Sequence, residues 1–370
     1  MKIGILTVPF NNNYGGFLQA YALKYVLSRE GHEVVFINRR RNRNRTFKFK
    51  IKSFVYKLLG FTRYRNSKIC EISRNTNMFK DKYLQPITEP YFTTEELRAS
   101  NQLGLECFIF GSDQVWRYRY AQDSITDFFG GFIENKAIPR FSYAASMGTD
   151  TLEFPEHYVN KCSRLLEAFT SVSVREYSSQ DLLINYFSVK DVKVVIDPTL
   201  LLEKNVYQKL FAEYGKSITR PYIMTYLLDE TTSQRNSIDA LAKDKALEVI
   251  DFKAQTGSIT KMKIMEPVEK WLYYIANAEI VITDSFHGTV FSILFNTPFI
   301  TYYNKKRGLA RVKDLLSTFN LLSKMVSNED SLADINTDYY DWAKVNQVLE
   351  HRKEQSMEFL RKSLEKCQSS

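Results

Sequence analysis

One histidine stands beside small and hydroxyl-bearing residues in the segment 278–303, AEIVITDSFHGTVFSILFNTPFITYY. A run of β-branched residues, 280–282, predicts a buried strand, and the apolar residues that follow recur at helical spacing. Ser285 can cap that helix, with His287 and Gly288 in its first turn. A helix N-terminus attracts anions, and an imidazole adds a proton donor. The segment therefore predicts an anion site; a histidine that only caps a turn is the structural alternative.

Polar side chains also follow other predicted strands. Asp113 comes after the apolar run 106–110, and Arg175 ends a later strand. A guanidinium in that place can hold a carboxylate or a phosphate through two hydrogen bonds. Trp116 offers a flat apolar wall on which a sugar ring can stack. The structural alternatives are a turn-capping aspartate, a core tryptophan, and an ion pair between Arg175 and Glu176.

The first residues predict a βαβ unit. A strand over 2–8 leads into a polar loop, 11–16, followed by a helix and a second strand over 34–37. Loops at the carboxyl ends of strands are where α/β proteins bind ligands. The loop lacks GxGxxG spacing, so we infer no dinucleotide, and its glycines could serve the turn alone.

Strands and helices alternate through the rest of the chain. Further strands are expected at 140–145, 171–175, 193–196, 222–228, 248–251, 280–283 and 299–303, with helices near 156–169, 231–245, 268–277, 287–295 and 308–319. Such alternation in both halves predicts an α/β fold of two Rossmann-like, doubly wound domains facing a cleft. We expect an N-terminal domain over 1–200, a C-terminal domain over 201–335, and a helix within 336–370 that packs back on the first domain.

Six segments resemble, in order, the motifs of the polysaccharide pyruvyl transferase family. They are Asn13-Tyr14-Gly15-Gly16, GSDQVW at 111–116, SYAAS at 142–146, SVRE at 173–176, Asp197-Pro198-Thr199, and DSFHGT at 284–289. Each is weak alone, but six in order are specific for the family. The resemblance implies a GT-B-like fold and an enzyme that takes pyruvate from phosphoenolpyruvate, forms a cyclic ketal across two sugar hydroxyls, and releases phosphate.

That chemistry needs cations for the donor, an acid for the enol carbon or the leaving phosphate, and a base for the hydroxyls. We assign His287 as the acid and Asp113 as the base. The candidate donor-binding residues are Ser285, Gly288, Thr289, Arg175 and Arg311. The candidate acceptor-binding residues are Asn13, Tyr14, Ser112, Gln114 and Trp116. No metal or cofactor is expected, since phosphoenolpyruvate is itself the donor substrate.

The resemblance has one departure at the histidine motif. Some family members carry an arginine at the position of Ser285, two residues before the histidine. Another cation must supply that charge in this chain, which makes Lys305, Arg307 and Arg311 stronger candidates.

Composition limits the class of protein. A chain of 370 residues with 44% hydrophobic residues can build two cores. Its four cysteines show no metal-ligand spacing, which favours a reducing compartment. No apolar run approaches the length of a signal peptide or a transmembrane helix. We therefore expect a cytoplasmic protein.

The positive charge is concentrated in one segment. Twelve of the 51 Lys and Arg residues lie within 34–70, where no Asp or Glu occurs. Within 39–68, basic residues alternate with aromatic and aliphatic ones, a pattern typical of a helix in an anionic membrane interface. Nucleic-acid binding and a helix docked on the domain are the alternatives. A peripheral membrane contact would suit an acceptor on a lipid carrier, which the family implies.

Two other functions fit the same features. A GT-B glycosyltransferase could hold the diphosphate of a nucleotide sugar at the same helix N-terminus. A non-catalytic relative could keep the fold and bind sugar or membrane only. The first would bind nucleotides, and the second would tolerate loss of His287 and Asp113.

Overall fold

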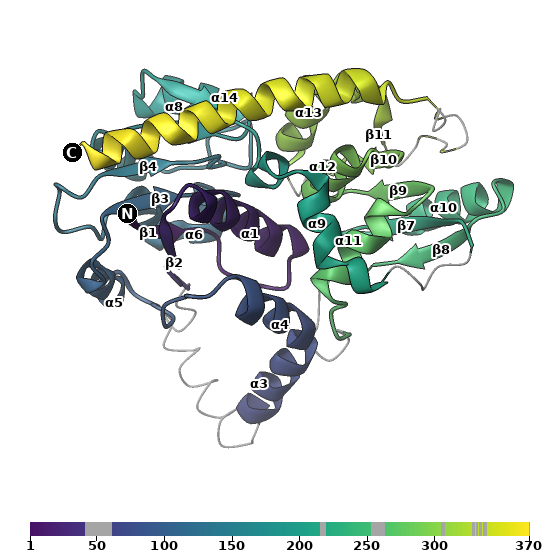
Figure 1. The fold of residues 1–370 in the computed structure, drawn as a ribbon, viewed down its shortest axis with the longest axis horizontal. Coiled ribbons are helices and arrows are strands. Elements are labelled where there is room, and N and C mark those ends of the chain that lie inside the picture. The colour runs from purple at the N-terminus through teal and green to yellow at the C-terminus, as the bar shows by residue number, and fades with distance from the viewer. Residues whose placement is uncertain are drawn as a thin grey trace.

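The computed structural model describes residues 1–40, 61–214, 220–252, 263–304, 308–327 and 339–369, together with residues 330, 332 and 335; the side chains of 61–66 are not described. Two parallel sheets lie side by side, with helices around both (Figure 1). The α/β fold with two parallel sheets predicted from the sequence is thereby confirmed.

The N-terminal sheet has the order β2-β1-β3-β4. Its strands are β1 (Lys2–Leu6), β2 (Glu33–Phe36), β3 (Cys107–Phe110) and β4 (Arg140–Ser142). A parallel pair, β5 (Val172–Val174) and β6 (Val192–Val194), continues from β4 through single bridges such as that between Phe141 and Ser171. The helices of this half are α1 (Tyr14–Arg29), α3 (Phe61–Ile72), α4 (Arg74–Tyr83), α5 (Thr94–Arg98), α6 (Tyr118–Ala121), α7 (Glu156–Leu166) and α8 (Tyr177–Phe187), with 3-10 turns η1 (Ala99–Gln102) and η2 (Gln122–Phe129).

The C-terminal sheet has the order β11-β10-β9-β7-β8. Its strands are β7 (Tyr222–Tyr226), β8 (Glu248–Asp251), β9 (Ile280–Thr283), β10 (Phe299–Tyr302) and β11 (Met325–Val326). Its helices are α10 (Thr232–Asp244), α11 (Val268–Ala276), α12 (Phe286–Phe295) and α13 (Leu309–Thr318), with the 3-10 turn η6 (Leu322–Lys324). In both sheets the first strand lies between the second and the third, so a switch point separates β1 from β3 and β7 from β9.

Both faces of each sheet are buried, as parallel sheets require. Side-chain alternation along β1 sends Ile3 and Ile5 into one core cluster and Leu6 into another. In β9, Val281 joins the first of these clusters and Ile282 a third. The first cluster extends through both halves of the molecule, so apolar packing joins the two sheets.

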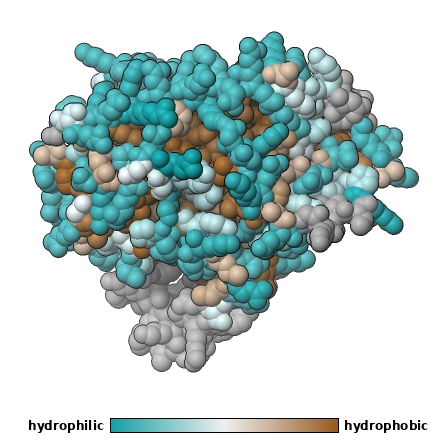
Figure 2. Space-filling model, in the orientation of Figure 1, coloured by the Kyte–Doolittle hydropathy of each residue, from teal (hydrophilic) through white to brown (hydrophobic). Residues whose placement is uncertain are grey.

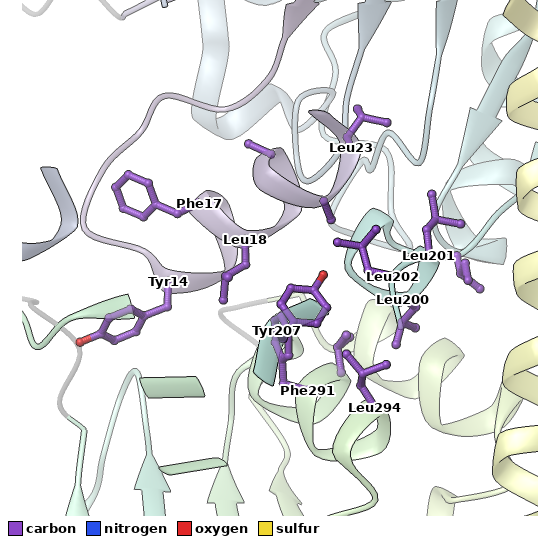
Figure 3. Close-up of a cluster of buried hydrophobic side chains, with 14 of the residues drawn as sticks. Tyr14, Phe17, Leu18, Leu23, Leu200, Leu201, Leu202, Tyr207, Phe291 and Leu294 are labelled. Atoms are coloured by element: carbon purple, nitrogen blue, oxygen red, sulfur yellow. The ribbon is translucent and has the colours of Figure 1, made fainter. Parts of the chain in front are cut away.

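Residues from α1, the crossing segment and α12 form the middle of that shared cluster (Figure 3). The crossing segment consists of η3 (Pro198–Leu201), α9 (Lys204–Leu210) and η4 (Ala212–Tyr214). The Tyr207 ring packs edge-on against Phe291 of α12, with centroids 5.0 Å apart. Tyr14 of α1 stacks on Trp271 of α11, with centroids 5.2 Å apart. Aromatic contacts thus hold the N-terminal helix against the C-terminal sheet's helices.

The C-terminal helix α14 (Trp342–Gln368) crosses the whole molecule (Figure 1). Just before it, the Tyr340 hydroxyl accepts a hydrogen bond from Phe299 N in β10, at 2.8 Å. Farther along, the Arg361 guanidinium pairs with Glu30 at the end of α1, at 2.9 Å. The helix therefore contacts elements of both halves. The domain boundaries at residues 200 and 335 stay a prediction.

Most of the basic segment 39–68 lies outside the described residues. Its first residue, Arg39, is buried and pairs with Asp127 at 2.7 Å. Arg39 therefore belongs to the N-terminal core rather than to an exposed basic surface. On the face shown in Figure 2, hydrophilic residues predominate and small hydrophobic patches lie between them.

Candidate active site

Several polar residues follow the carboxyl ends of strands at the two switch points. Ser112 and Asp113 come after β3, beside β1, and Asp284 and Ser285 come after β9, beside β7. Arg175 directly follows β5. Because ligands of open α/β sheets bind outside the carboxyl ends of strands at such points, these residues mark the site.

The Arg175 guanidinium lies at the centre of a buried charge cluster. It contacts Asp197 at 2.5 Å, Asp113 at 3.2 Å and Glu176 at 3.6 Å. Arg175 also stacks on the ring of Phe286, with the guanidinium carbon 4.1 Å from the centroid. A guanidinium with three carboxylate neighbours and an aromatic face has little freedom to rotate, so Arg175 is fixed in place.

Two residues of the C-terminal half complete the cluster. His287, in the first turn of α12, is 4% exposed, and its Nε2 lies 3.5 Å from the Asp197 carboxylate. Arg311 of α13 is also buried, and its Nη1 lies 3.7 Å from Asp113. The cluster thus joins carboxylates from one half to cations from the other.

Electrostatics keeps both central carboxylates ionised. Burial alone would raise the pKa of Asp113, but the charges of Arg175, His287 and Arg311 outweigh it and hold that pKa below its usual range. For Asp197, burial is likewise outweighed by its close contact with His287 and by the charge of Arg175, and its pKa is lowered strongly. Burial and the neighbouring Arg175 lower the pKa of Arg311 to about 10. At neutral pH Asp113 is therefore an anion.

The glycine loop of the N-terminal half touches the histidine. A Cβ placed on Gly15, in the first turn of α1, would lie 2.0 Å from His287 Nδ1. Only a residue without a side chain fits there. A second glycine, Gly111, has φ 125°, and a Cβ on it would lie 2.2 Å from the Tyr143 carbonyl oxygen. These close approaches explain why the first turn of α1 and the position directly after β3 carry glycine.

The donor-side residues predicted from the sequence fall into two groups. Arg175, His287 and Arg311 meet in the cluster. Ser285 instead caps α12. Its Oγ accepts a hydrogen bond from Gly288 N at 3.4 Å, and its carbonyl oxygen accepts one from Thr289 N at 3.0 Å. Both N–H groups are thus engaged within the helix. Lys305 and Arg307 lie outside the described residues.

Two acceptor-side predictions need correction. Trp116 is 0% exposed, and its ring stacks on that of Phe129, with centroids 4.9 Å apart. Its Nε1 donates a hydrogen bond to the Phe128 carbonyl at 2.8 Å. Its ring is a core element and offers no face to a sugar. Tyr14 is also buried, and its hydroxyl donates to the Glu266 carbonyl at 3.1 Å. Its role in this structure is to join the two halves.

The other acceptor-side residues differ in their exposure. Asn13 is exposed at the start of α1, and its side chain makes no capping hydrogen bond. Ser112 is buried, with Oγ 3.5 Å from the Asp197 carboxylate. Gln114 accepts a hydrogen bond from Arg117 at 2.8 Å and lines a cavity of about 50 Å³ together with Tyr120.

Asp197 is the site residue that our assignment from the sequence omitted. Its Oδ1 accepts hydrogen bonds from Thr199 N at 3.0 Å and Thr199 Oγ1 at 2.7 Å, while Oδ2 faces Arg175 and His287. Two signals were available: an acid directly after a predicted strand, and its place in one of the six motifs.

Within the described part of the chain, no group of three or more His, Cys, Asp and Glu side chains could hold a metal ion. No helix in that part is long and apolar enough to span a bilayer.

Comparison with solved structures defines the architecture. The UDP-GlcNAc 2-epimerase of Neisseria meningitidis, bound to UDP-GlcNAc, superposes with a TM-score of 0.53 at 10% identity, covering 99% of this chain and 100% of that one. The UDP-N-acetylglucosamine 2-epimerase of Rickettsia bellii superposes with a TM-score of 0.54 at 10% identity, covering 98% of this chain and 96% of that one. UGT89C1 of Arabidopsis thaliana, complexed with UDP-L-rhamnose, superposes with a TM-score of 0.51 at 8% identity, covering 98% of this chain and 99% of that one. At these identities the likeness shows the fold alone, which is GT-B-like.

The family follows from sequence comparison. The profile of the polysaccharide pyruvyl transferase family matches residues 13–306, which include the glycine loop and the histidine motif. The chain belongs to that family. No curated protein matched the chain.

Proposed function

We propose that this protein transfers pyruvate from phosphoenolpyruvate to a sugar of a cell-surface polysaccharide or its lipid-linked precursor, forming a pyruvate ketal. The observation that carries the proposal is the meeting of Arg175, His287 and Arg311 with two ionised aspartates between the two sheets. Family membership supports the same reaction class.

The donor carries a carboxylate and a phosphate, and the cluster offers two guanidinium groups for them. Arg175 is held tightly by Asp197 at 2.5 Å, so it suits the role of a fixed anchor. Arg311 lies 3.7 Å from Asp113, a longer contact that an incoming anion can replace. We therefore assign the phosphate to Arg311 and the carboxylate to Arg175.

Ketal formation joins two hydroxyl oxygens to C2 of the donor and breaks the bond between C2 and the phosphate oxygen. The hydroxyls release two protons, of which one ends on C3 and the other on the phosphate. His287 is the acid that delivers a proton. Asp113 accepts one from the attacking hydroxyl, and because its lowered pKa makes it a weak base, its larger effect is to stabilise positive charge at C2.

The acceptor would approach from the N-terminal half. Asn13 is exposed at the start of α1, and Gln114 borders the small cavity beside Tyr120. These polar groups can bind sugar hydroxyls next to Asp113.

A cytoplasmic location and a peripheral membrane contact through 39–68 belong to the same proposal. Because Arg39 is buried against Asp127, the contact would involve the residues after it. Deletion of residues 41–60 should reduce co-sedimentation with anionic vesicles and leave binding of phosphoenolpyruvate unchanged. Equal co-sedimentation of the deletion and the full chain would exclude the membrane contact.

A thermal-shift comparison tests the donor. A ligand that binds only the folded state raises the melting temperature. Phosphoenolpyruvate should raise it for the wild type and have a much smaller effect on His287→Ala, while UDP-, GDP- and CMP-sugars should have none. If a nucleotide sugar raises the melting temperature and phosphoenolpyruvate does not, the proposal of pyruvyl transfer is wrong and glycosyl transfer is the better assignment.

A further inference from the structure

Two thiols from distant parts of the chain meet in the core of the N-terminal half. Cys107 lies in β3 and Cys367 in the last turn of α14, 260 residues apart, yet their Sγ atoms are 3.0 Å from each other. Cys107 is 0% exposed and Cys367 6%. Figure 1 shows this end of α14 above the N-terminal sheet. The remaining cysteines, Cys70 of α3 and Cys162 of α7, are also free thiols.

We propose that Cys107 and Cys367 form a disulfide when the protein meets a peroxide, and that this bond clamps α14 to the N-terminal sheet. The inference is independent of the pyruvyl transfer proposed above. In a reducing compartment the pair would be dithiol at rest and would close only under oxidative stress.

The two thiols differ in a way that assigns their roles. Cys107 donates a hydrogen bond to Cys367, and this lowers the pKa of the Cys367 thiol. Cys367 also lies in the last turn of α14 and keeps 6% of its surface exposed, whereas Cys107 is fully buried in β3, so a small oxidant reaches Cys367 first. Cys367 is therefore the thiol that reacts first, and Cys107 is the one that resolves the product.

The chemistry balances with a peroxide as the oxidant. The Cys367 thiolate attacks one oxygen of hydrogen peroxide, the O–O bond breaks, and a sulfenic acid and hydroxide form. The Cys107 sulfur then attacks the sulfenic sulfur, the S–O bond breaks, and water leaves. In total, two thiols lose two electrons and two protons, and one peroxide becomes two waters.

The clamp would act on a helix that supports the charge cluster. The Ser356 hydroxyl of α14 accepts a hydrogen bond from Ile196 N at 3.0 Å, and Arg352 donates to the Val194 carbonyl at 3.2 Å. Both bonds hold the segment that leads from β6 to Asp197. A covalent link between α14 and β3 keeps this support in place, and it restricts the unfolded chain because it closes a long loop.

Peptide mapping and thiol counting test the clamp. After treatment with hydrogen peroxide, the protein unfolded in denaturant should expose two reactive thiols instead of four. Mapping should find one peptide pair, linked through Cys107 and Cys367. The melting temperature should rise, and dithiothreitol should reverse the rise.

Matched variants separate this pair from the other cysteines. Cys70→Ser together with Cys162→Ala should leave the stabilisation by peroxide intact, whereas Cys367→Ser should abolish it. Serine is close to cysteine in size, so Cys367→Ser should still fold, and mapping of the wild type requires no variant. A linked pair that contains Cys70 or Cys162, or sulfinic acid on Cys367 without a disulfide, would overturn the inference.

Discussion

The imidazole of His287 is enclosed by residues of both halves of the molecule. Asp197 faces its Nε2, and Gly15 packs against its Nδ1. The ring has no room to turn away from the cluster, so its position depends on small residues beside it. This makes Gly15 a sensitive position although it has no functional group.

Substitution of Gly15 by alanine should therefore displace the imidazole. A Cβ there would lie 2.0 Å from Nδ1, and a misplacement of about 1 Å is enough to reduce function by about a hundredfold. We expect binding of phosphoenolpyruvate, measured by calorimetry, to weaken at least about tenfold. Helix α1 itself should tolerate alanine.

Gly16 provides the matched control, because a Cβ on it would approach no atom closer than 3.5 Å, at Asn13. Gly16→Ala should bind phosphoenolpyruvate as the wild type does. Equal binding by both variants would show that the contact between Gly15 and His287 has no functional role.

Stability against acid should depend on Asp113 and Asp197. Both have folded-state pKa values below those of the unfolded chain, so their contribution is present above about pH 4 and is lost as the pH falls further. We expect Asp197→Asn to lower the free energy of unfolding at pH 7, because Arg175 loses a buried partner. The difference from wild type should shrink below about pH 4. Urea titrations at several pH values measure this difference in the free energy of unfolding. A difference that stays the same at every pH would contradict the assigned charges.

Trp116 and Asp197 show what the sequence can and cannot tell about single residues. The segments that carry Trp116 and Asp197 were both recognisable as parts of a site from their residue types and their place after a strand. A large aromatic residue, however, suits a core as well as a sugar site. The stacking of Trp116 on Phe129 depends on a partner 13 positions along the chain in another element, which no local pattern reveals. Asp197 was visible as a motif but not as the residue that faces Arg175 and His287.

At the scale of elements, local patterns located several helices closely, although helix α8 (Tyr177–Phe187) was not expected. The expected helix over 287–295 is α12, Phe286–Phe295, with Ser285 as its N-cap and Asn296 in a left-handed conformation at its end. The expected helix over 268–277 is Val268–Ala276. Capping residues and apolar periodicity act within a few positions, which is why the sequence alone can locate such elements.

Helix α14 should stabilise the segment before Asp197 through one hydroxyl. Ser356→Ala leaves the buried Ile196 N–H without the acceptor it now has at 3.0 Å, which should cost about 1–3 kcal/mol in the free energy of unfolding. Ser363 is the control: it is equally buried on the same helix, but its hydroxyl donates to Phe359 within that helix. Urea unfolding should show a clearly smaller effect for Ser363→Ala. Similar losses would mean that the Ile196 contact is unimportant.

At the scale of the whole molecule, the cluster exists only because two halves meet. Asp113, Arg175 and Asp197 follow strands β3, β5 and β6 of the N-terminal half, and His287 and Arg311 come from helices of the C-terminal half. The alternation of strands and helices predicted two parallel sheets and placed these residues at strand ends. It could not predict which side chains pair across the interface, because that depends on how the two halves dock through packing such as Tyr14 on Trp271.

The most direct test of the central claim is calorimetric binding of phosphoenolpyruvate to Arg175→Lys. The contacts of Arg175 with Asp197 and Asp113 use a planar guanidinium that lysine cannot reproduce. Arg39→Lys is the matched control for the donor site: Arg39 is also a buried arginine, but it pairs with Asp127, which is not one of the cluster's carboxylates, and it lines the small cavity on the acceptor side. We predict at least about tenfold weaker binding for Arg175→Lys and unchanged binding for Arg39→Lys. Wild-type affinity in Arg175→Lys would contradict the assignment of the cluster as the donor site.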